Sequence, residues 1–214
     1  MSDIITVGVN INEQAEAERE SRSAFVRFAA VFFIVLTIIA SLKTFVFMHV
    51  EVEGSSMENT MVDGDAVIVD KLAKIERGDV VVFKVKGVVM GETDENKMYI
   101  KRVIGIPGDT VWSENGVVYY SRDGVLETIA DGDYVKGLTY LNYTARKTDI
   151  PKTVVPEGCY FLMGDNRAVS FDCRYFGEGR TPKCVSEDYI CGVVPSFVIE
   201  NKDSELLKAL MRFV

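Results

Sequence analysis

A serine in a small-residue turn is the first candidate for chemistry in this chain. Ser56 ends the sequence Gly54-Ser55-Ser56, which follows a stretch in which Val50 and Val52 alternate with glutamates. The alternation predicts a half-buried strand, and the small residues predict a turn that can hold a side chain out of a sheet. A strand that ends in an ordinary polar turn has the same pattern. The stretch therefore suggests a nucleophile without establishing one.

A serine nucleophile needs a base, which is usually a histidine or a lysine. The only histidine, His49, lies at the end of the hydrophobic segment, and lysine is the usual alternative base. Lys101 lies inside the apolar, β-like run 98–109. Burial there would lower the pKa of the lysine toward neutrality, as a base requires, although a lysine stem can also lie along apolar surface with its amine in water. Ser56 and Lys101 are therefore the candidate pair.

Together these stretches resemble bacterial type I signal peptidases, which are membrane-anchored serine–lysine peptidases that remove secretory signal peptides. Four motifs stand in the family's order: Ser56-Met57, Arg77-Gly78-Asp79-Val80-Val81-Val82-Phe83, the run from Tyr99 to Asp109, and Gly164-Asp165-Asn166-Arg167 followed by Arg174-Tyr175-Phe176-Gly177. The resemblance implies Ser56 as nucleophile and Lys101 as general base. It also implies three supporting residues, which are Ser170, hydrogen-bonded to the lysine, Asp172 and Arg174.

Several positions depart from the family pattern. The family usually reads Ser-Met-x-Pro-Thr-Leu, and this chain has Asn59 and Met61 in place of the proline and the leucine. In the last motif the polar pair before the serine is Ala168-Val169, and the serine after the aspartate is Cys173. None of these changes removes a catalytic group, but they affect the turn after the nucleophile and the hydrogen bonds of the last motif.

The resemblance also implies an oxyanion site and substrate pockets. Gly54 stands where some members carry an oxyanion-binding serine, which leaves main-chain N–H groups, that of Ser56 among them, as the donors. In the family, apolar residues beside the dyad shape shallow pockets for small side chains, so signal peptides with an Ala-x-Ala-like ending would fit. The matching positions here are Val50, Val52, Met57, Met61, Tyr99 and Ile100.

One segment is long and apolar enough to span a bilayer. Residues 28–42 carry no charge, and the segment 24–48 reaches spanning length if Arg27 and Lys43 extend their charges to the interfaces. No small-residue cleavage site follows it, and residues 1–23 form an acidic tail, expected to be loose or a short surface helix. An uncleaved transmembrane anchor is therefore favoured over a cleaved signal peptide.

Charges around the anchor predict its orientation. Arg19, Arg22 and Arg27 precede the apolar run, whereas Lys43 is the only close cation after it. This bias predicts a single-pass protein of the cell membrane with a cytoplasmic N-terminus and an extracytoplasmic catalytic domain. Membrane lipid is then a partner.

After residue 49 the pattern is mostly β. Short β-branched or aromatic runs, separated by glycine-containing turns, predict a sandwich or barrel; they are 66–69, 80–83, 99–106, 117–120 and 160–163. The resemblance implies a signal-peptidase/LexA-like β-barrel-type catalytic core in two parts, 49–109 and 156–214, with a small inserted β domain over 110–155. A long β meander is the alternative for the insert. Residues 206–213 predict a short C-terminal helix.

Composition excludes some functions. The chain has 214 residues, 48% of them hydrophobic, and a net charge of −8, which argues against nucleic acid as a partner. Four cysteines lie on the predicted outer side, where at least one disulfide is expected: Cys159, Cys173, Cys184 and Cys191. Their spacing and the remote histidine make zinc unfavourable, and the mechanism needs no metal or organic cofactor.

Two other functions fit the same fold. An inactive, membrane-anchored assembly or chaperone module would not need the dyad, yet both of its residues are present. A self-cleaving, repressor-like serine–lysine peptidase would share the core, but such proteins are soluble and this chain has an anchor. The favoured function is an endopeptidase that cleaves signal peptides from exported preproteins, with the protein-export machinery as a candidate partner.

Overall fold

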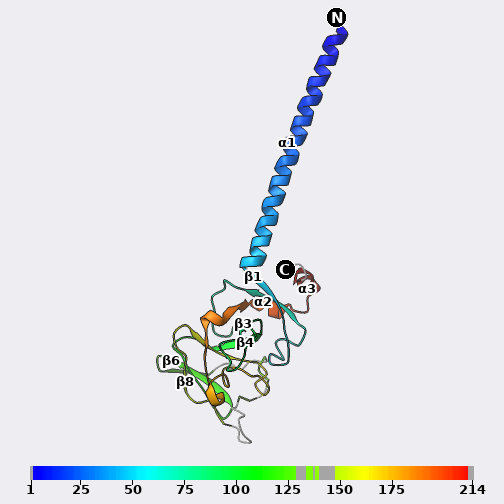
Figure 1. The fold of residues 1–214 in the computed structure, drawn as a ribbon. Helices are drawn as coiled ribbons and strands as arrows, with labels where there is room; N and C mark the ends of the chain where they lie inside the picture. Colours follow the sequence, from blue (N-terminus) through cyan, green and yellow to red (C-terminus); the bar gives the residue numbers. More distant parts are fainter. Residues whose placement is uncertain (1, 129–133, 137, 140–147, 212–214) are drawn as a thin grey trace. The chain divides into compact units, whose positions relative to one another are not determined.

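The computed structural model describes residues 2–128, 134–136, 138–139 and 148–211, and it divides into two units, residues 1–45 and 46–214. The first unit is one continuous helix, α1 (Ser2–Phe45), drawn in blue in Figure 1. Its stretch Glu13–Phe45 is the one described helix that is long and apolar enough to cross a membrane.

Both ends of α1 differ from the sequence expectation. The helix includes residues 2–23, expected as a loose tail or a short surface helix; its part 13–22 is rich in alanine, glutamate and arginine, which favour helix. It ends at Phe45, three residues before the expected end of the anchor at Met48. Phe47 and Met48 instead pair with Asp70 and Val69 in a β ladder.

The second unit is mainly β, as predicted, and its larger sheet has seven antiparallel strands. In spatial order they are β1 (Phe47–Glu51), β2 (Ala66–Asp70), β11 (Ile190–Val194), β3 (Val80–Lys84), β4 (Met98–Gly105), β9 (Cys159–Met163) and β10 (Val185–Ser186). Val80 to Phe83 in β3 are all buried, because this central strand has a hydrophobic core on each face. The β-branched residues of these runs fill both cores.

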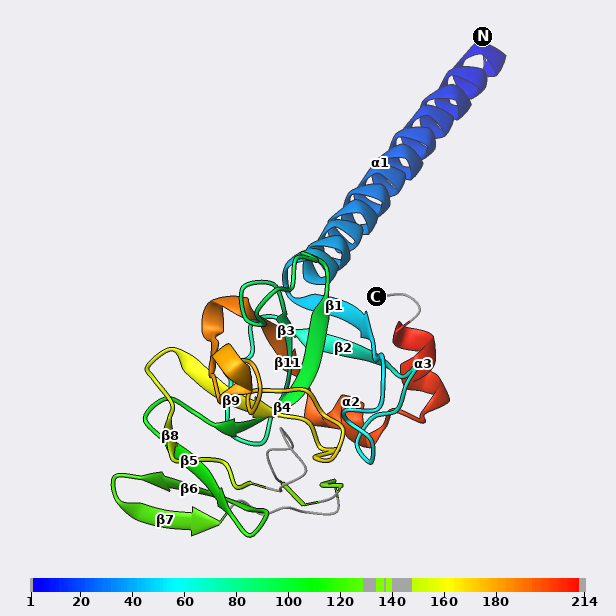
Figure 2. The ribbon, with the colours of Figure 1, turned by 60° about the horizontal axis from the view of Figure 1, so that its bottom comes forward.

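A smaller sheet is built from the region that the sequence marks as an insert. Its order is β7 (Val125–Thr128), β6 (Val117–Arg122), β5 (Thr110–Glu114) and β8 (Thr153–Val154). It lies at the end of the unit away from β1 in both views (Figures 1 and 2). Val111 and Val118 belong to the same core cluster as Phe83 and Phe161 of the larger sheet. The two sheets therefore share one core.

Two short helices close the other core. They are α2 (Ser196–Glu200) and α3 (Glu205–Met211), which bury Val198 and Leu207 against β2 and its neighbours. The helix predicted over 206–213 is thus present as α3, and residues 212–213 lie outside the described residues. Two 3₁₀ turns, η1 (Glu178–Arg180) and η2 (Glu187–Tyr189), complete the C-terminal part.

The expected disulfide is not formed, and all four cysteines are free. Cys173 is fully buried, and its Sγ accepts a hydrogen bond from the Leu162 N–H at 3.1 Å. Burial raises the pKa of the Cys173 thiol well above its usual value and that of Cys184 to about 12. Since the thiolate is the species that forms disulfides, these thiols are poor starting points for oxidation.

Candidate active site

The candidate nucleophile and base meet beside the middle of β4. Lys101 pairs with Val81 of β3, and its side chain is buried, with 3% of its surface exposed. Its Nζ lies 2.7 Å from Ser56 Oγ and 2.8 Å from the Ile100 carbonyl oxygen. Lys101 therefore faces the serine, and its stem does not carry the amine out to solvent.

The surroundings of Lys101 favour its neutral form. Burial lowers the pKa of Lys101 from 10.5 to about 8, although the carboxylates of Asp172 and Asp165 oppose this by attraction. The positive charge of Arg174 adds to the lowering. An amine with this pKa is partly deprotonated near neutral pH, as a general base must be.

Ser56 is held in a turn whose backbone is fixed on both sides. Before it, Gly54 takes a left-handed conformation (φ 81°), and its N–H donates to Asp63 Oδ1 at 2.6 Å. After it, the Met57 carbonyl accepts hydrogen bonds from the N–H groups of Thr60 (3.0 Å) and Met61 (2.9 Å). Because the Gly54 N–H is bonded to Asp63, it is not an oxyanion donor in this conformation.

Asn59, the departure from the family's proline, has a conformational reason. Its φ is 85°, in the left-handed region that asparagine tolerates better than most residues and that proline, with φ fixed near −65°, does not reach. The turn after the nucleophile is thus built around asparagine.

The last motif binds the nucleophile turn from the other side. The Asn166 N–H donates to the Ser56 carbonyl at 3.0 Å, and Asn166 Nδ2 donates to the Ser55 carbonyl at 3.1 Å. An ideal Cβ placed on Gly164 would lie 2.5 Å from the Ser56 carbonyl oxygen and 2.3 Å from Ser170 Oγ. Gly164 therefore allows the two segments to touch.

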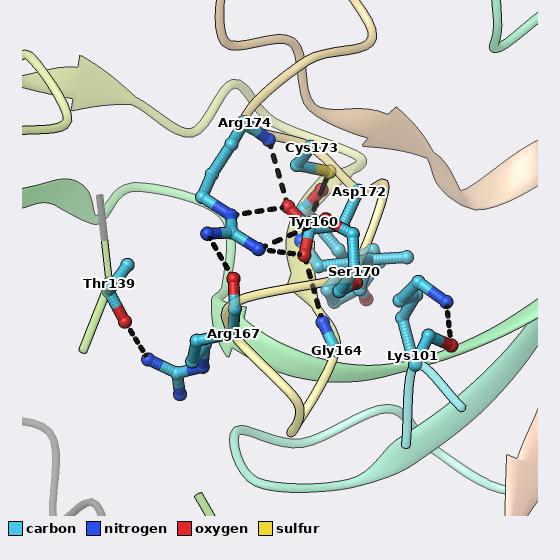
Figure 3. A network of polar contacts seen from close by, with 11 residues as sticks. Lys101, Thr139, Tyr160, Gly164, Arg167, Ser170, Asp172, Cys173 and Arg174 are labelled. Carbon is cyan, nitrogen blue, oxygen red and sulfur yellow. Dashed lines mark hydrogen bonds and ion pairs between the residues drawn. The ribbon is translucent and has the colours of Figure 1, made fainter. Parts of the chain in front are cut away.

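Asp172 and Arg174 form a fully buried ion pair beside the lysine (Figure 3). Arg174 Nε donates to Asp172 Oδ1 at 2.8 Å, and Arg174 Nη2 donates to Asp172 Oδ2 at 2.9 Å. Burial raises the pKa of Asp172, but attraction and hydrogen bonds from Arg174 and the Gly164 N–H outweigh it and leave the pKa below its usual value. Asp172 is therefore a buried carboxylate.

The hydrogen bond expected between Ser170 and Lys101 is not formed. Ser170 is 4% exposed, and among the described residues no hydrogen bond joins its Oγ to the Lys101 amine. The donors of Lys101 are directed to Ser56 and the Ile100 carbonyl instead. Ser170 lies beside the dyad without completing it in this state.

A second charged group near the site was not singled out from the sequence. Asp165 is fully buried and accepts from Arg102 Nε (2.8 Å), Arg102 Nη2 (2.7 Å) and Thr60 Oγ1 (2.5 Å). It ties the strand of Lys101 to the nucleophile turn. Arg102, Asp165 and Asn166 all stand within the motifs that carry the family resemblance. Their presence in those motifs is the sequence feature that could have identified them.

A pocket of about 520 Å³ opens beside the dyad. Its lining includes both dyad residues and Val50, Tyr99 and Ile100 of the predicted substrate-binding set. The other three predicted residues do not line it: Val52, Met57 and Met61 are at most 2% exposed and belong to the core behind the turn. The two methionines turn inward because the turn after Ser56 is closed by hydrogen bonds to the Met57 carbonyl, which places both side chains under the loop. The remaining lining residues are Glu51, Glu53, Gly54, Ser55, Val82, Asp94, Asn96, Lys97, Met98, Val169 and Phe171.

Comparison with known proteins adds an independent observation. The family model described as "Signal peptidase, peptidase S26" matches residues 25–199. The chain is 35% identical over 157 residues to signal peptidase I of Bacillus caldolyticus, which covers 68% of this chain and 79% of that protein. It is 34% identical over 181 residues to signal peptidase IB of Staphylococcus aureus, which covers 77% of this chain and 83% of that protein.

Among solved structures, a signal peptidase I from Enterococcus faecalis V583 is 27% identical, with a TM-score of 0.37, and the match covers 57% of this chain and 98% of that chain. The family model spans most of the chain, and both sequence relatives are matched over more than three quarters of their own length. The chain therefore belongs to the signal peptidase family, peptidase S26.

Proposed function

We propose that this protein is a membrane-anchored endopeptidase that cleaves N-terminal signal peptides from exported preproteins with Ser56 and Lys101. Membership of the signal peptidase family supports the reaction. The observation that carries the assignment of residues is the 2.7 Å distance between Lys101 Nζ and Ser56 Oγ in a buried setting. This distance lies within the range needed for proton transfer between a nucleophile and its base.

The reaction follows from this geometry. Neutral Lys101 takes the hydroxyl proton of Ser56 as Oγ attacks the carbonyl carbon of the scissile peptide bond. The resulting ammonium then gives that proton to the leaving amine, the C–N bond breaks, and an ester remains on Ser56. A water molecule, deprotonated by Lys101, attacks the ester, and the proton returns to Oγ. Main-chain N–H groups at the turn stabilise the oxyanion.

Asp172 and Arg174 act as positioning residues in this proposal. Arg174 donates to the Arg167 carbonyl at 2.9 Å and to the Ser170 carbonyl at 3.2 Å, so the ion pair shapes the loop that faces the lysine. Asp172 also attracts the proton of Lys101, while burial and Arg174 oppose it. The pair thus sets both the geometry and the charge of the base.

The substrate and the location follow from the pocket and the anchor. Val50, Tyr99 and Ile100 give the cleft beside Ser56 an apolar wall, which suits the small side chains of an Ala-x-Ala-like ending. The stretch Glu13–Phe45 contains the membrane anchor, and the arginines before its uncharged run 28–42 favour a cytoplasmic N-terminus, with Ser56 on the outer side. Lipid and the export machinery are then the surroundings in which the enzyme meets preproteins.

The test uses the full chain purified in detergent. Incubation with a labelled preprotein, followed by sequencing of the new N-terminus, should give one cut after an Ala-x-Ala-like ending. Ser56→Ala should abolish the cut, and Ser55→Ala, which changes the exposed neighbouring hydroxyl, should retain it. An inactive scaffold would give no product with the parent protein. An active Ser56→Ala together with an inactive Ser55→Ala would move the nucleophile to the neighbouring residue.

A further inference from the structure

Val169 and Phe171 lie on either side of buried Ser170 and line the cleft that contains the dyad. Val169 is 60% exposed and Phe171 is 37% exposed, whereas Ser170 is 4% exposed and Asp172 is fully buried. The segment thus directs its polar side chains inward and its apolar side chains toward the cleft. Apolar residues exposed inside a cleft are a common mark of a binding surface.

The position of the Phe171 ring is fixed from behind. The ring stacks on Tyr175, with centroids 6.0 Å apart and an interplanar angle of 5°. It also contacts Phe176 edge-on, with centroids 5.4 Å apart, and Phe176 is itself 2% exposed. Such aromatic pairs stabilise a preferred geometry. The exposed side of Phe171 is therefore a preformed surface that needs little reordering when a ligand binds.

The wall formed by Val169 and Phe171 carries no charge, in contrast to another part of the rim. Glu51, Glu53, Asp94 and Lys97 line the same pocket with charged groups. The pocket of about 520 Å³ has room for more than the small side chain expected next to the scissile bond. An uncharged, rigid wall in such a cleft favours an aliphatic or aromatic side chain and disfavours an acidic one, because burying a charge without a partner is costly.

We propose that Val169 and Phe171 form an additional subsite that selects preproteins with a large apolar side chain at one position near the scissile bond. This proposal rests on the signal-peptide cleavage proposed above, and it adds the chemistry of a second recognised residue. The subsite is distinct from the wall made by Val50, Tyr99 and Ile100, which comes from β1 and β4. A difference of one or a few methylene groups in an apolar pocket changes kcat/KM by about 10- to 200-fold.

The experiment uses the full chain in detergent micelles and a panel of peptides that share one Ala-x-Ala-like ending. Each other position, from three residues before to three residues after the scissile bond, carries alanine, leucine or aspartate in turn. The parent enzyme should prefer leucine over alanine by about 10-fold or more at one position and should disfavour aspartate there. The double variant Val169→Ala/Phe171→Ala should reduce this leucine preference to less than about 3-fold.

A second variant and a control keep the result decisive if removal of the ring harms folding. Val169→Asp changes an exposed side chain and should shift the preference at that same position from leucine toward lysine. Met90→Ala removes a side chain that is 70% exposed and is not part of the pocket lining, and it should leave the leucine preference unchanged.

Three outcomes decide the matter. A leucine preference that disappears in the double variant and changes to lysine in Val169→Asp supports the subsite. Cleavage without any apolar preference, or a preference that survives both variants, overturns the subsite and leaves the proposed function standing. Absence of cleavage of every peptide and of a full preprotein by the parent enzyme overturns the proposed function itself.

Discussion

Two groups of charged residues on the same unit differ in how they relate to water. The buried charge network, which we define as Lys101, Asp172 and Arg174, has no member more than 3% exposed. In the loop between β3 and β4, the pair Lys86–Glu95 has side chains 47% and 77% exposed. Charges in the network set the pKa of Lys101 and the geometry around it. Charges in the loop are screened by water and salt, so they interact weakly. Location, and not the number of ion pairs, decides which charges matter for the chemistry.

The largest effect is expected from a change that keeps charge but prevents its removal. Lys101→Arg should lose activity as completely as Lys101→Met, because arginine does not deprotonate at any usable pH. Loss of a residue that acts directly on the nucleophile typically lowers kcat by about 10⁴-fold or more. Rates of preprotein cleavage measure it. Substantial activity in Lys101→Arg would mean that the residue serves as a fixed positive charge.

Breaking the buried ion pair should have the next largest effect. Arg174→Met would leave Asp172 as a buried, unpaired carboxylate, and removal of one partner of such a pair costs about 3–5 kcal/mol of unfolding free energy. Chemical denaturation of the variant and the parent measures the loss. The double variant Asp172→Leu/Arg174→Met removes both charges and should recover part of that stability. If Arg174→Met were as stable as the parent, the pair would not be buried in solution.

The low pKa of Lys101 should make the stability of the protein depend on pH. The pKa of Lys101 is about 8 in the folded protein and near 10.5 in the unfolded chain. Between these pH values the unfolded chain binds more protons than the folded protein. The stability of the parent protein should therefore rise as the pH increases from about 8 to 10.5. Below pH 8 the penalty is fully present, and Lys101→Met should be more stable by roughly 3 kcal/mol. Denaturation at several pH values tests this.

The same titration governs the rate. Cleavage by the parent enzyme should rise with pH through about 8, as Lys101 loses its proton. A flat profile between pH 6 and 9, together with equal stability of the parent and Lys101→Met, would place the pKa of the amine outside this range.

The smallest effect is expected in the surface loop. Lys86→Met removes an ion pair that faces solvent, and such pairs contribute less than about 1 kcal/mol to stability. Neither Lys86 nor Glu95 lines the pocket, so cleavage rates should stay close to those of the parent. Denaturation at low and high salt provides the measurement, since only a solvent-exposed pair weakens with salt. A loss above 2 kcal/mol would remove the distinction between the two groups.

Much of the fold was readable because β-branched runs and turn residues mark strands directly. The runs around 66–69, 80–83 and 160–163 each became a strand of the large sheet. β11 was missed because Gly192 interrupts its apolar run, at a bulge where the β11–β3 register shifts. The sequence does not predict one continuous helix through residues 2–23, because residues 2–12 have low helix propensity and only that of the polar stretch 13–22 favours helix.

The candidate dyad could be predicted because its residues stand in motifs, but the surroundings could not. Met57 and Met61 were expected on the pocket wall, and the closed turn places them in the core. Phe171 reaches the cleft only because the last motif folds back against the nucleophile turn, a long-range contact that no local pattern shows. Likewise, the sequence places four cysteines near one another in the chain but does not show that burial raises the pKa of the Cys173 and Cys184 thiols.

The close approach of Gly164 to the Ser56 carbonyl suggests a practical tool. A single methyl group at residue 164 has no room, since it would lie 2.5 Å from that oxygen and 2.3 Å from Ser170 Oγ. Gly164→Ala would therefore displace the nucleophile while leaving every charged side chain of the site in the protein. Such a variant would lose cleavage through displacement alone, so it would separate what the position of the hydroxyl contributes from what the charges around it contribute.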